Sequence, residues 1–348
     1  MEADKRPVLY LVDGSSYIHR AFHAIRHLST RDGTPTNAVY GVTQMLLKLI
    51  KDRAPSHLAV VFDAGGKNFR HRMYPAYKAN RPPAPEELKV QFPLVREAVE
   101  AFDLPLVEVE GVEADDVIAT LARQAEREGF EVVIVSGDKD LMQLVDEHTV
   151  MYDTQSDVVY DAAGVREKLG VCPEQVVDLL ALMGDSSDNI PGVTKVGKKT
   201  AARLLSEHPD LEAVLRAAPG MKKSKLREHL IEDADKARLS QRLASLKEDV
   251  ALDCAPSGFA LLPAPRREPD LDALDDFLTR MEFTGLRRDL IGKRTIDTDA
   301  YRTILDRSEL ERVAGRIRAA GKFALDLETT SLDPMRAAIV GISLSPAE

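Results

Sequence analysis

Three short runs of apolar, mostly β-branched residues constrain the fold of this chain more than any other feature. They are residues 8–12, 58–62 and 132–135, and they end in or just before Asp13, Asp63 and Asp138. Helical patterns separate the runs, which therefore predict parallel strands of an α/β sheet. Because ligands of such sheets bind at the carboxyl ends of the strands, these aspartates should gather at one edge. Asp140 follows closely, and for it a role as a helix cap is a serious alternative.

A second acidic group begins a predicted amphipathic helix, where Glu113, Asp115 and Asp116 stand within four positions. Acids at a helix N-terminus complement the helix dipole, so this group alone needs no function. Glu113 and Asp116 should share one face, whereas Asp115 should point elsewhere. Beside the strand-end aspartates, such crowded carboxylates repel one another unless a cation lies among them. Oxygen ligands without His or Cys suit Mg²⁺ or Mn²⁺.

Composition sets only broad limits on partners. The 348 residues suffice for two domains, and 30% of them are charged, with a formal net charge of −10. This excess of acid argues only weakly against nucleic acid, because local basic patches matter more than the sum. Cys172 and Cys254 form neither a metal-ligand spacing nor a disulfide framework. With no signal-like or membrane-spanning run near the N-terminus, we expect a cytoplasmic protein without a membrane partner. We also expect a monomer.

Between Gly65 and Pro85 cations alternate with aromatic rings. The residues are Lys67, Phe69, Arg70, His71, Arg72, Tyr74, Tyr77, Lys78 and Arg81. An ordinary solvated loop would have a similar composition, and composition alone favours that interpretation. The segment leaves the predicted sheet beside Asp63, however, and a mixture of cations that contact phosphates and rings that stack on bases is typical of a single-stranded nucleic-acid channel.

Residues 183–201 combine acids, glycines and lysines. Their glycines and Lys198 superficially fit a phosphate-binding P-loop, but Lys199 replaces the required Ser or Thr and no strand precedes, which excludes an NTPase. A helix, a glycine-bounded turn and a second helix predict a helix-hairpin-helix that holds a phosphate backbone without reading sequence. Its candidate contacts are Gly192, Lys195, Gly197, Lys198 and Lys199. Asp185 and Asp188 are open to two interpretations, turn residues or ion ligands.

The sequence predicts four segments. Residues 1–180 contain the predicted sheet with its acids, and residues 181–290 contain the predicted hairpin. Residues 291–300 form a linker, and Arg287 to Thr298 has the composition of one. Residues 301–348 begin a further domain. In it Asp326 and Glu328, two positions apart, should share one face of a strand. We expect this last segment to be poorly packed.

These residues closely resemble the N-terminal 5′ nuclease region of bacterial DNA polymerase I. The shared stretches are residues 11–16 (LVDGSS), 61–64 (VFDA), 77–82 (YKANRP), 111–116 (GVEADD), 137–140 (GDKD) and 181–193 (ALMGDSSDNIPGV). They occur in order over about the first 290 residues. The segment from Tyr301 resembles the start of the proofreading exonuclease, with Asp326 and Glu328 on its first acidic motif, and the chain contains no polymerase motif.

The resemblance implies an α/β, PIN-like or flap endonuclease-like fold with a central, mostly parallel sheet, a helical arch and a C-terminal helix-hairpin-helix. Residues 1–180 would form the catalytic domain, with the arch at about 65–105, and residues 181–290 the helix-hairpin-helix domain. It implies hydrolysis of DNA at 5′ flaps, nicks and RNA primer ends in replication and repair. The implied cofactors are two Mg²⁺ ions, for which Mn²⁺ can substitute, and the resemblance allows a monovalent cation at the hairpin.

The resemblance also implies roles for individual residues. Ligands of the first ion are Asp13, Asp63, Glu113, Asp115 and Asp116, and those of the second are Asp138, Asp140, Asp185 and Asp188. Lys78 and Arg81 match the catalytic residues at the arch base that approach the scissile phosphate. DNA contacts are His19, Arg20, Arg70 and Tyr77, although His19 stands where relatives often carry a stacking ring.

Two other functions compete with this one. A DNA-binding module with a silent site would hold junctions through the hairpin and arch, but every ligand position is filled here. A phosphatase that uses Asp13 as a covalent nucleophile would turn over small phosphate esters, and it would leave the hairpin unexplained.

Overall fold

The computed structural model describes residues 6–261, 271–291, 302–331 and 336–346. The chain forms two compact units, Met1–Gly292 and Lys293–Glu348. The predicted boundary near residue 180 falls inside the first unit, while the predicted linker at 291–300 lies outside the described residues except at Ile291. Among the described helices none has both the length and the apolar character needed to cross a bilayer.

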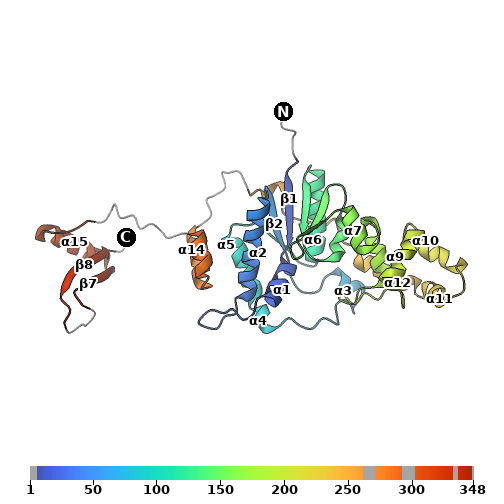
Figure 1. The fold of residues 1–348 in the computed structure, drawn as a ribbon, viewed down its shortest axis with the longest axis horizontal. Coiled ribbons are helices and arrows are strands. Elements are labelled where there is room, and N and C mark those ends of the chain that lie inside the picture. The colour runs from blue at the N-terminus through green and yellow to red at the C-terminus, as the bar shows by residue number, and fades with distance from the viewer. Residues whose placement is uncertain (1–5, 262–270, 292–301, 332–335, 347–348) are drawn as a thin grey trace, which may run out of the picture. The chain divides into compact units, whose positions relative to one another are not determined.

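A six-stranded sheet forms the centre of the first unit, in the order β3-β2-β1-β4-β5-β6 (Figure 1). Its strands are β1 Val8–Asp13, β2 His57–Asp63, β3 Leu106–Val109, β4 Glu131–Val135, β5 Thr149–Asp153 and β6 Val158–Tyr160. Strands β1 to β5 are parallel, and β6 pairs antiparallel with β5. The three apolar runs are the adjacent strands β1, β2 and β4. The predicted, mostly parallel sheet is therefore confirmed.

Alternate side chains of the central strands enter two separate cores. Leu9 and Leu11 of β1 are fully buried in one core. Val12 of β1 and Phe62 of β2 are buried in the other. Because apolar residues cover both faces, helices must pack on both sides of the sheet.

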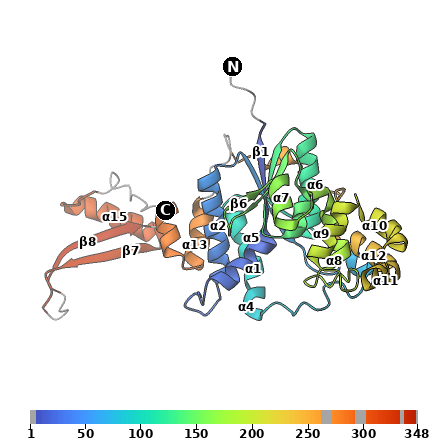
Figure 2. The same cartoon turned by 45° about the vertical axis from the view of Figure 1, so that its right-hand side comes forward.

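Helices from the N-terminal third cover one face. They are α1 Gly14–Ala24, α2 Asn37–Arg53 and α5 Gln91–Ala101, joined by α13 Leu271–Arg280 from later in the chain. Figures 1 and 2 show α2 and α5 on the opposite side of the sheet from α6 (Ala114–Arg127). Gln91 ties α5 to α2, because its Oε1 accepts a hydrogen bond of 2.7 Å from the amide of Ala38.

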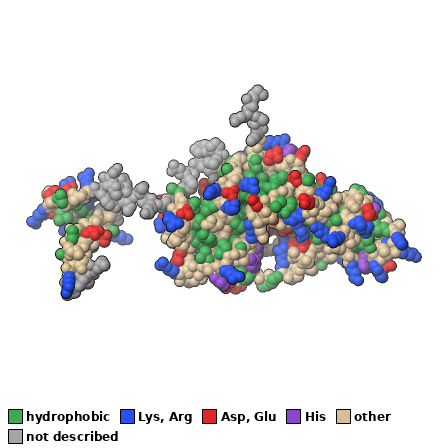
Figure 3. Space-filling view, in the orientation of Figure 1, with side chains coloured by type: hydrophobic (Ala, Val, Ile, Leu, Met, Phe, Trp, Pro, Cys, Tyr) green, Lys and Arg blue, Asp and Glu red, His purple; other side chains and the backbone are tan. Residues whose placement is uncertain are grey.

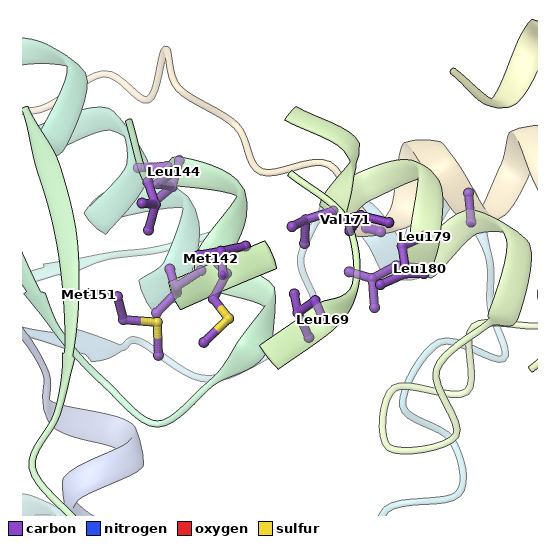
Figure 4. Close-up of a cluster of buried hydrophobic side chains, with 14 of the residues drawn as sticks. Met142, Leu144, Met151, Leu169, Val171, Leu179 and Leu180 are labelled. Atoms are coloured by element: carbon purple, nitrogen blue, oxygen red, sulfur yellow. The ribbon is translucent and has the colours of Figure 1, made fainter. Parts of the chain in front are cut away.

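The other core extends from α6 across the sheet into the second half of the unit. Its further helices are α7 Ala162–Leu169, α8 Val176–Met183, α9 Lys198–Glu207, α10 Leu211–Ala217, α11 Lys225–Glu232 and α12 Ala234–Ala244. Figure 4 shows part of this cluster, where Met142 and Met151 lie on the sheet side and Leu179 and Leu180 on α8. One continuous core therefore joins the predicted catalytic and hairpin regions.

The predicted arch at about 65–105 ends in α5, and before α5 it contains little helix. Two short helices, α3 Phe69–Met73 and α4 Glu86–Lys89, are joined by a non-helical segment that runs below the sheet in Figures 1 and 2. Four 3₁₀ turns complete the first unit: η1 Lys139–Leu144, η2 Pro173–Gln175, η3 Ala218–Gly220 and η4 Pro256–Phe259.

The prediction of a linker from Arg287 is wrong for its first residues. Helix α14, Thr284–Leu290, packs on α13 through the buried side chain of Leu286. Arg287 also pairs with Asp275 of α13, with nitrogen–oxygen distances of 2.5 and 2.9 Å. A single apolar residue in a charged stretch anchors this helix, so the sequence pattern gave little sign of it.

The second unit contains helix α15, Arg307–Ala320, and the antiparallel pair β7 Phe323–Thr329 and β8 Ile339–Pro346. All seven residues of β7 are exposed, including Asp326 and Glu328. The expected weak packing of this segment is confirmed in the described residues.

Candidate active site

Asp13, at the end of β1, lies at the centre of the candidate site. Its Oδ1 accepts a hydrogen bond of 2.8 Å from the amide of Ser16, so Asp13 itself caps α1. Its Oδ2 accepts one of 2.7 Å from Oγ of Ser136, which follows β4. Burial, followed by the charges of Asp63 and Asp138, raises the pKa of Asp13 to about 6. The two neutral hydrogen-bond donors therefore do not offset the effect of burial and of the neighbouring charges on the Asp13 carboxylate.

Three more carboxylates interact electrostatically with Asp13. Asp63 Oδ1 accepts a hydrogen bond of 2.9 Å from the amide of Ala114, which brings the end of β2 to the first turn of α6. Burial, and then Asp13, Asp138 and Asp63, raise the pKa of Asp115 well above its usual value. We call Asp13, Asp63, Asp115 and Asp138 the strand-end cluster. Within the described part of the chain, none of the ion pairs involves a member of it.

Asp116 points into the interior and is completely buried. Its two oxygens accept hydrogen bonds of 2.7 Å each from Arg70, and amides of Glu113 and Lys247 donate at 3.1 and 2.9 Å. Because this carboxylate is already fully satisfied, the prediction that Asp116 is an ion ligand is wrong. Asp115, which the helical spacing directed elsewhere, is the residue that joins the strand-end cluster.

Arg70 has the same structural role and is 1% exposed. Besides Asp116, it donates to the carbonyls of Leu243 and Ser245 at 2.8 and 2.9 Å, and it lies 3.2 Å from Glu113. The predicted DNA contact at Arg70 is therefore wrong, because its guanidinium ties α3 to α6 and α12. The prediction that Glu113 and Asp116 share a face is confirmed, since both contact Arg70.

Tyr77 and Lys78 join two acids at the base of the arch. The hydroxyl of Tyr77 lies 2.9 Å from both Glu113 Oε2 and Asp188 Oδ2, and Lys78 Nζ pairs with the same two carboxylates. Arg81 also pairs with Asp188. Tyr77 is only 3% exposed, so the predicted DNA contact by its ring is wrong. Its neighbours Lys78 and Arg81 instead fix the arch base to the loop after α8.

Lys139 lies between Asp140 and Asp185. Its ammonium pairs with Asp185 and lies 3.3 Å from Oδ1 of Asp140, which is buried and accepts no hydrogen bond. Burial and then Asp138 raise the pKa of Asp140 to about 7, while Lys139 opposes the shift. The turn interpretation of Asp185 is confirmed, because its Oδ1 accepts a hydrogen bond of 2.7 Å from the amide of Ser187.

Asp138 acts as a helix cap, the role that the sequence had suggested for Asp140. Its Oδ1 accepts a hydrogen bond of 2.9 Å from the amide of Asp140 and thereby caps η1. Asp140 is the capped residue and leaves its own carboxylate without such a bond.

A cavity of about 860 Å³ opens beside these acids. Its lining brings together Asp138, Lys139, Asp140, Asp185 and Asp188 with His19, Arg20, His23 and Arg81. Figure 3 shows acidic and histidine side chains at a hollow in this face. The pKa of His19 is lowered by burial and then by His23 and Arg81, so its ring is neutral at pH 7. The cavity thus combines carboxylates on one wall with cations and a neutral ring on another.

The predicted hairpin connects α8 with α9. A Cβ on Gly192 would come within 2.3 Å of the amide nitrogen of Gly184, so only glycine permits this close backbone contact. The amide of Gly192 donates to Ser240 Oγ at 3.0 Å, and its predicted DNA contact is therefore wrong. Lys195, Gly197, Lys198 and Lys199 are exposed, as a phosphate-binding surface requires.

Asp233, between α11 and α12, holds this hairpin in place. Its Oδ2 accepts a hydrogen bond of 2.7 Å from the amide of Thr194, and Lys236 Nζ lies 2.8 Å from Oδ1. Although burial raises the pKa of Asp233, these partners lower it to about 2.

Sequence reasoning missed the pairings that decide which acids are neutralised. It assigned no role to Lys139 or to Ser136. Both stand immediately around Asp138 at a strand end, and that position was the signal that could have identified them. As arranged, no three His, Cys, Asp or Glu side chains in the described ranges are placed to hold one ion directly.

Comparisons with known proteins cover most of the first unit. The family model for the 5′-3′ exonuclease N-terminal resolvase-like domain matches residues 8–170, and that for the 5′-3′ exonuclease C-terminal SAM fold matches residues 171–267. A 5′-3′ exonuclease from Aquifex aeolicus is 40% identical over 81% of this chain and 94% of its own length.

DNA polymerase I from Pseudomonas aeruginosa and from Rhizobium leguminosarum are 42% and 40% identical over 98% of this chain. The chain spans only 39% and 41% of their respective lengths. Among solved structures, the T5 5′-exonuclease aligns with a TM-score of 0.60 at 23% identity, covering 79% of this chain and 98% of that one. The catalytic core of Rad2 aligns with a TM-score of 0.52 at 18% identity, covering 79% and 88%. These two structures share the fold.

Proposed function

The chain belongs to the 5′-3′ exonuclease family found in bacterial DNA polymerase I, and from this premise we propose that it cuts DNA at 5′ flaps, nicks and RNA primer ends. The observation that carries this proposal is the strand-end cluster beside the cavity. Four carboxylates with no cation partner in the described residues meet there. One of them, Asp138, lines the cavity together with basic side chains.

Two divalent ions, Mg²⁺ with Mn²⁺ as a substitute, would supply the attacking hydroxide and stabilise the leaving oxygen. The chemistry of the donors fits, because the strand-end cluster is rich in oxygen and lacks a compensating charge. Oδ1 of Asp140, buried without a hydrogen bond, is a further donor. The T5 5′-exonuclease has been solved with divalent metal ions bound. Since no three acids are arranged for direct chelation, we propose that the ions are held partly through water.

The remaining acids would act in the second sphere around the ions. Glu113, Asp185 and Asp188 are each paired with a lysine or arginine. The pairs of Glu113 and Asp188 fix the positions of Lys78 and Arg81 at the arch base. The guanidinium of Arg81 lines the cavity, where it would offset charge on the scissile phosphate.

DNA would be held without sequence readout. The amide-rich start of α9 and the exposed Lys195, Lys198 and Lys199 suit backbone phosphates. His19 and Arg20 line the cavity and would contact the end of the strand that is cut. The Rad2 core has been solved with a DNA substrate. We propose that the protein acts on DNA as a monomer.

The test compares Asp63→Asn with wild type on a 5′-flap duplex. Cleavage by wild type should require Mg²⁺ and stop with EDTA. Asp63→Asn should lose cleavage by on the order of 10²–10³-fold or more, because it removes one electrostatic stabiliser, while flap binding in EDTA survives. Asp52→Asn is the matched control, since Asp52 lies on α2 and pairs with Lys48.

The other outcomes would contradict the residue assignment or the function. Cleavage by Asp63→Asn at the wild-type rate in Mg²⁺ would overturn the assignment of the acids. Binding without any cleavage by wild type would identify a DNA-binding module. Turnover of small phosphate esters with an aspartyl-phosphate at Asp13 would identify a phosphatase.

A further inference from the structure

Three lysines from separate elements meet where the cavity borders the hairpin. Lys139 belongs to η1, Lys168 to the last turn of α7 and Lys198 to the first turn of α9. Of these, Lys168 matches no motif that pointed to function, and it lies outside the acid pairs described above.

The side chain of Lys168 is held in a fixed position. Its ammonium donates a hydrogen bond of 3.0 Å to the hydroxyl of Tyr160 and lies 4.1 Å from the centre of that ring. Lys168 also lines the cavity that contains the acids. Asp153, an acid of the same cavity wall with which Lys168 interacts electrostatically, already accepts hydrogen bonds from Gln155 and Ser156 at 2.9 and 2.8 Å. The described structure gives Lys168 no ion pair, so its charge is available to a ligand.

Lys198 and Lys139 connect this point to the hairpin and to the acids. Lys198 Nζ donates a hydrogen bond of 2.5 Å to the backbone carbonyl of Lys168. Lys198 and Lys139 also line one small apolar pocket of about 60 Å³, together with Leu169, the neighbour of Lys168. Lys139 and Lys168 both line the larger cavity. Lys168 and Lys198 therefore lie between the hairpin and the acids, while Lys139, whose ammonium pairs with Asp185 and Asp140, marks the acidic end of this line.

We propose that Lys168 and Lys198 bind successive backbone phosphates of one DNA strand as it passes from the hairpin to the acidic site. This inference rests on the proposed function and deepens it, because it assigns a phosphate-binding role to Lys168. Ammonium groups recognise phosphates as point charges, so the contact is independent of base sequence. The path sets how far the hairpin-bound duplex lies from the cut.

The test measures flap-duplex binding by Lys168→Ala in EDTA over a range of salt concentrations. Loss of one phosphate contact should weaken binding about three- to tenfold at low salt and reduce the slope of log K against log salt by about one. In Mg²⁺, the Michaelis constant should rise by a similar factor while the turnover rate at saturating DNA stays within about twofold of wild type.

A second measurement locates the contact. One backbone phosphate at a time is replaced by an uncharged methylphosphonate in the duplex next to the flap. In wild type several such positions should weaken binding, and in Lys168→Ala the penalty at one of them should disappear. Tyr160→Phe keeps the ring and removes the hydrogen bond, so it should shift binding in the same direction by less. Lys48→Ala, on α2, is the matched control and should behave as wild type.

The outcomes separate this inference from the function on which it rests. If wild type cuts the flap but Lys168→Ala binds with unchanged affinity and salt slope, the phosphate path is wrong and the nuclease assignment stands. The path would also be wrong if the weakening of binding by Lys168→Ala simply added to that by a methylphosphonate at every position, because no phosphate would then be the partner of Lys168. If wild type does not cut DNA, the proposed function itself fails. Thermal unfolding of Lys168→Ala close to that of wild type establishes that the variant is folded.

Discussion

Two sets of acids lie around the ends of β1, β2 and β4, and they are compensated in opposite ways. The strand-end cluster, Asp13, Asp63, Asp115 and Asp138, has only neutral hydrogen-bond donors among the described residues. A second set, which we call the paired acids, is neutralised by side-chain cations. Its members are Glu113, Asp116, Asp185 and Asp188.

The contrast shows that an aspartate in a nuclease-like motif can serve the fold or the chemistry. Asp115 and Asp116 are neighbours on α6, yet the first joins the uncompensated cluster and the second holds Arg70. A buried carboxylate with a bidentate arginine is a structural element. A group of carboxylates that repel one another is suited to bind a cation, because the cation relieves the repulsion. Substitutions in the two sets should therefore affect different properties.

The largest expected effect on stability is at the buried pair. Asp116→Ala leaves Arg70 charged and buried without its partner, and should lower the free energy of unfolding by about 3–5 kcal/mol in urea titrations. Asp115→Asn, one residue away, should leave it unchanged or raise it, because it removes a mutually repelling charge. The double variant Arg70→Met, Asp116→Leu should recover much of the loss. Equal destabilisation by Asp115→Asn and Asp116→Ala would erase the distinction between the two sets.

The next effect is a pH dependence that Mg²⁺ should reverse. The folded-state pKa values of Asp13 and Asp140 are raised from 3.8 to about 6 and about 7. These carboxyls therefore favour the folded state while protonated, and in EDTA stability on the order of 1–3 kcal/mol should be lost as the pH rises from about 4 to about 7. Mg²⁺ should restore it at pH 8 and have little effect at pH 5. A stabilisation by Mg²⁺ of the same size at both pH values would show that the ion binds elsewhere.

The smallest effect concerns a cation-paired acid at the hairpin. Asp233 has its pKa lowered to about 2, so its contribution is present above about pH 4 and lost as the pH falls through about 2. Asp233→Asn should cost about 1 kcal/mol and increase hydrogen exchange at the amide of Thr194. Flap binding should weaken several-fold, while cleavage at saturating DNA should persist. Unchanged exchange at Thr194 would show that Asp233 does not hold the hairpin.

The sequence predicted the sheet and the strand-end aspartates because strand periodicity and loop position depend on local patterns. Tertiary packing decided the rest. The spacing on α6 placed Glu113 and Asp116 on one face, but it could not show that this face meets Arg70. Arg70 and Tyr77 stood among exposed cations and aromatics, and their burial depends on distant segments around Leu243 and Asp188. Gly192 likewise proved to be a packing contact with Gly184.

The central claim is that the strand-end cluster holds divalent ions, and anomalous diffraction from crystals grown with Mn²⁺ tests it most directly. The account predicts a Mn²⁺ peak among Asp13, Asp63, Asp115 and Asp138 that disappears in Asp63→Asn, with Asp116 still bound to Arg70. Mn²⁺ bound only away from these four carboxylates, or bound by Asp116 in place of Arg70, would contradict it.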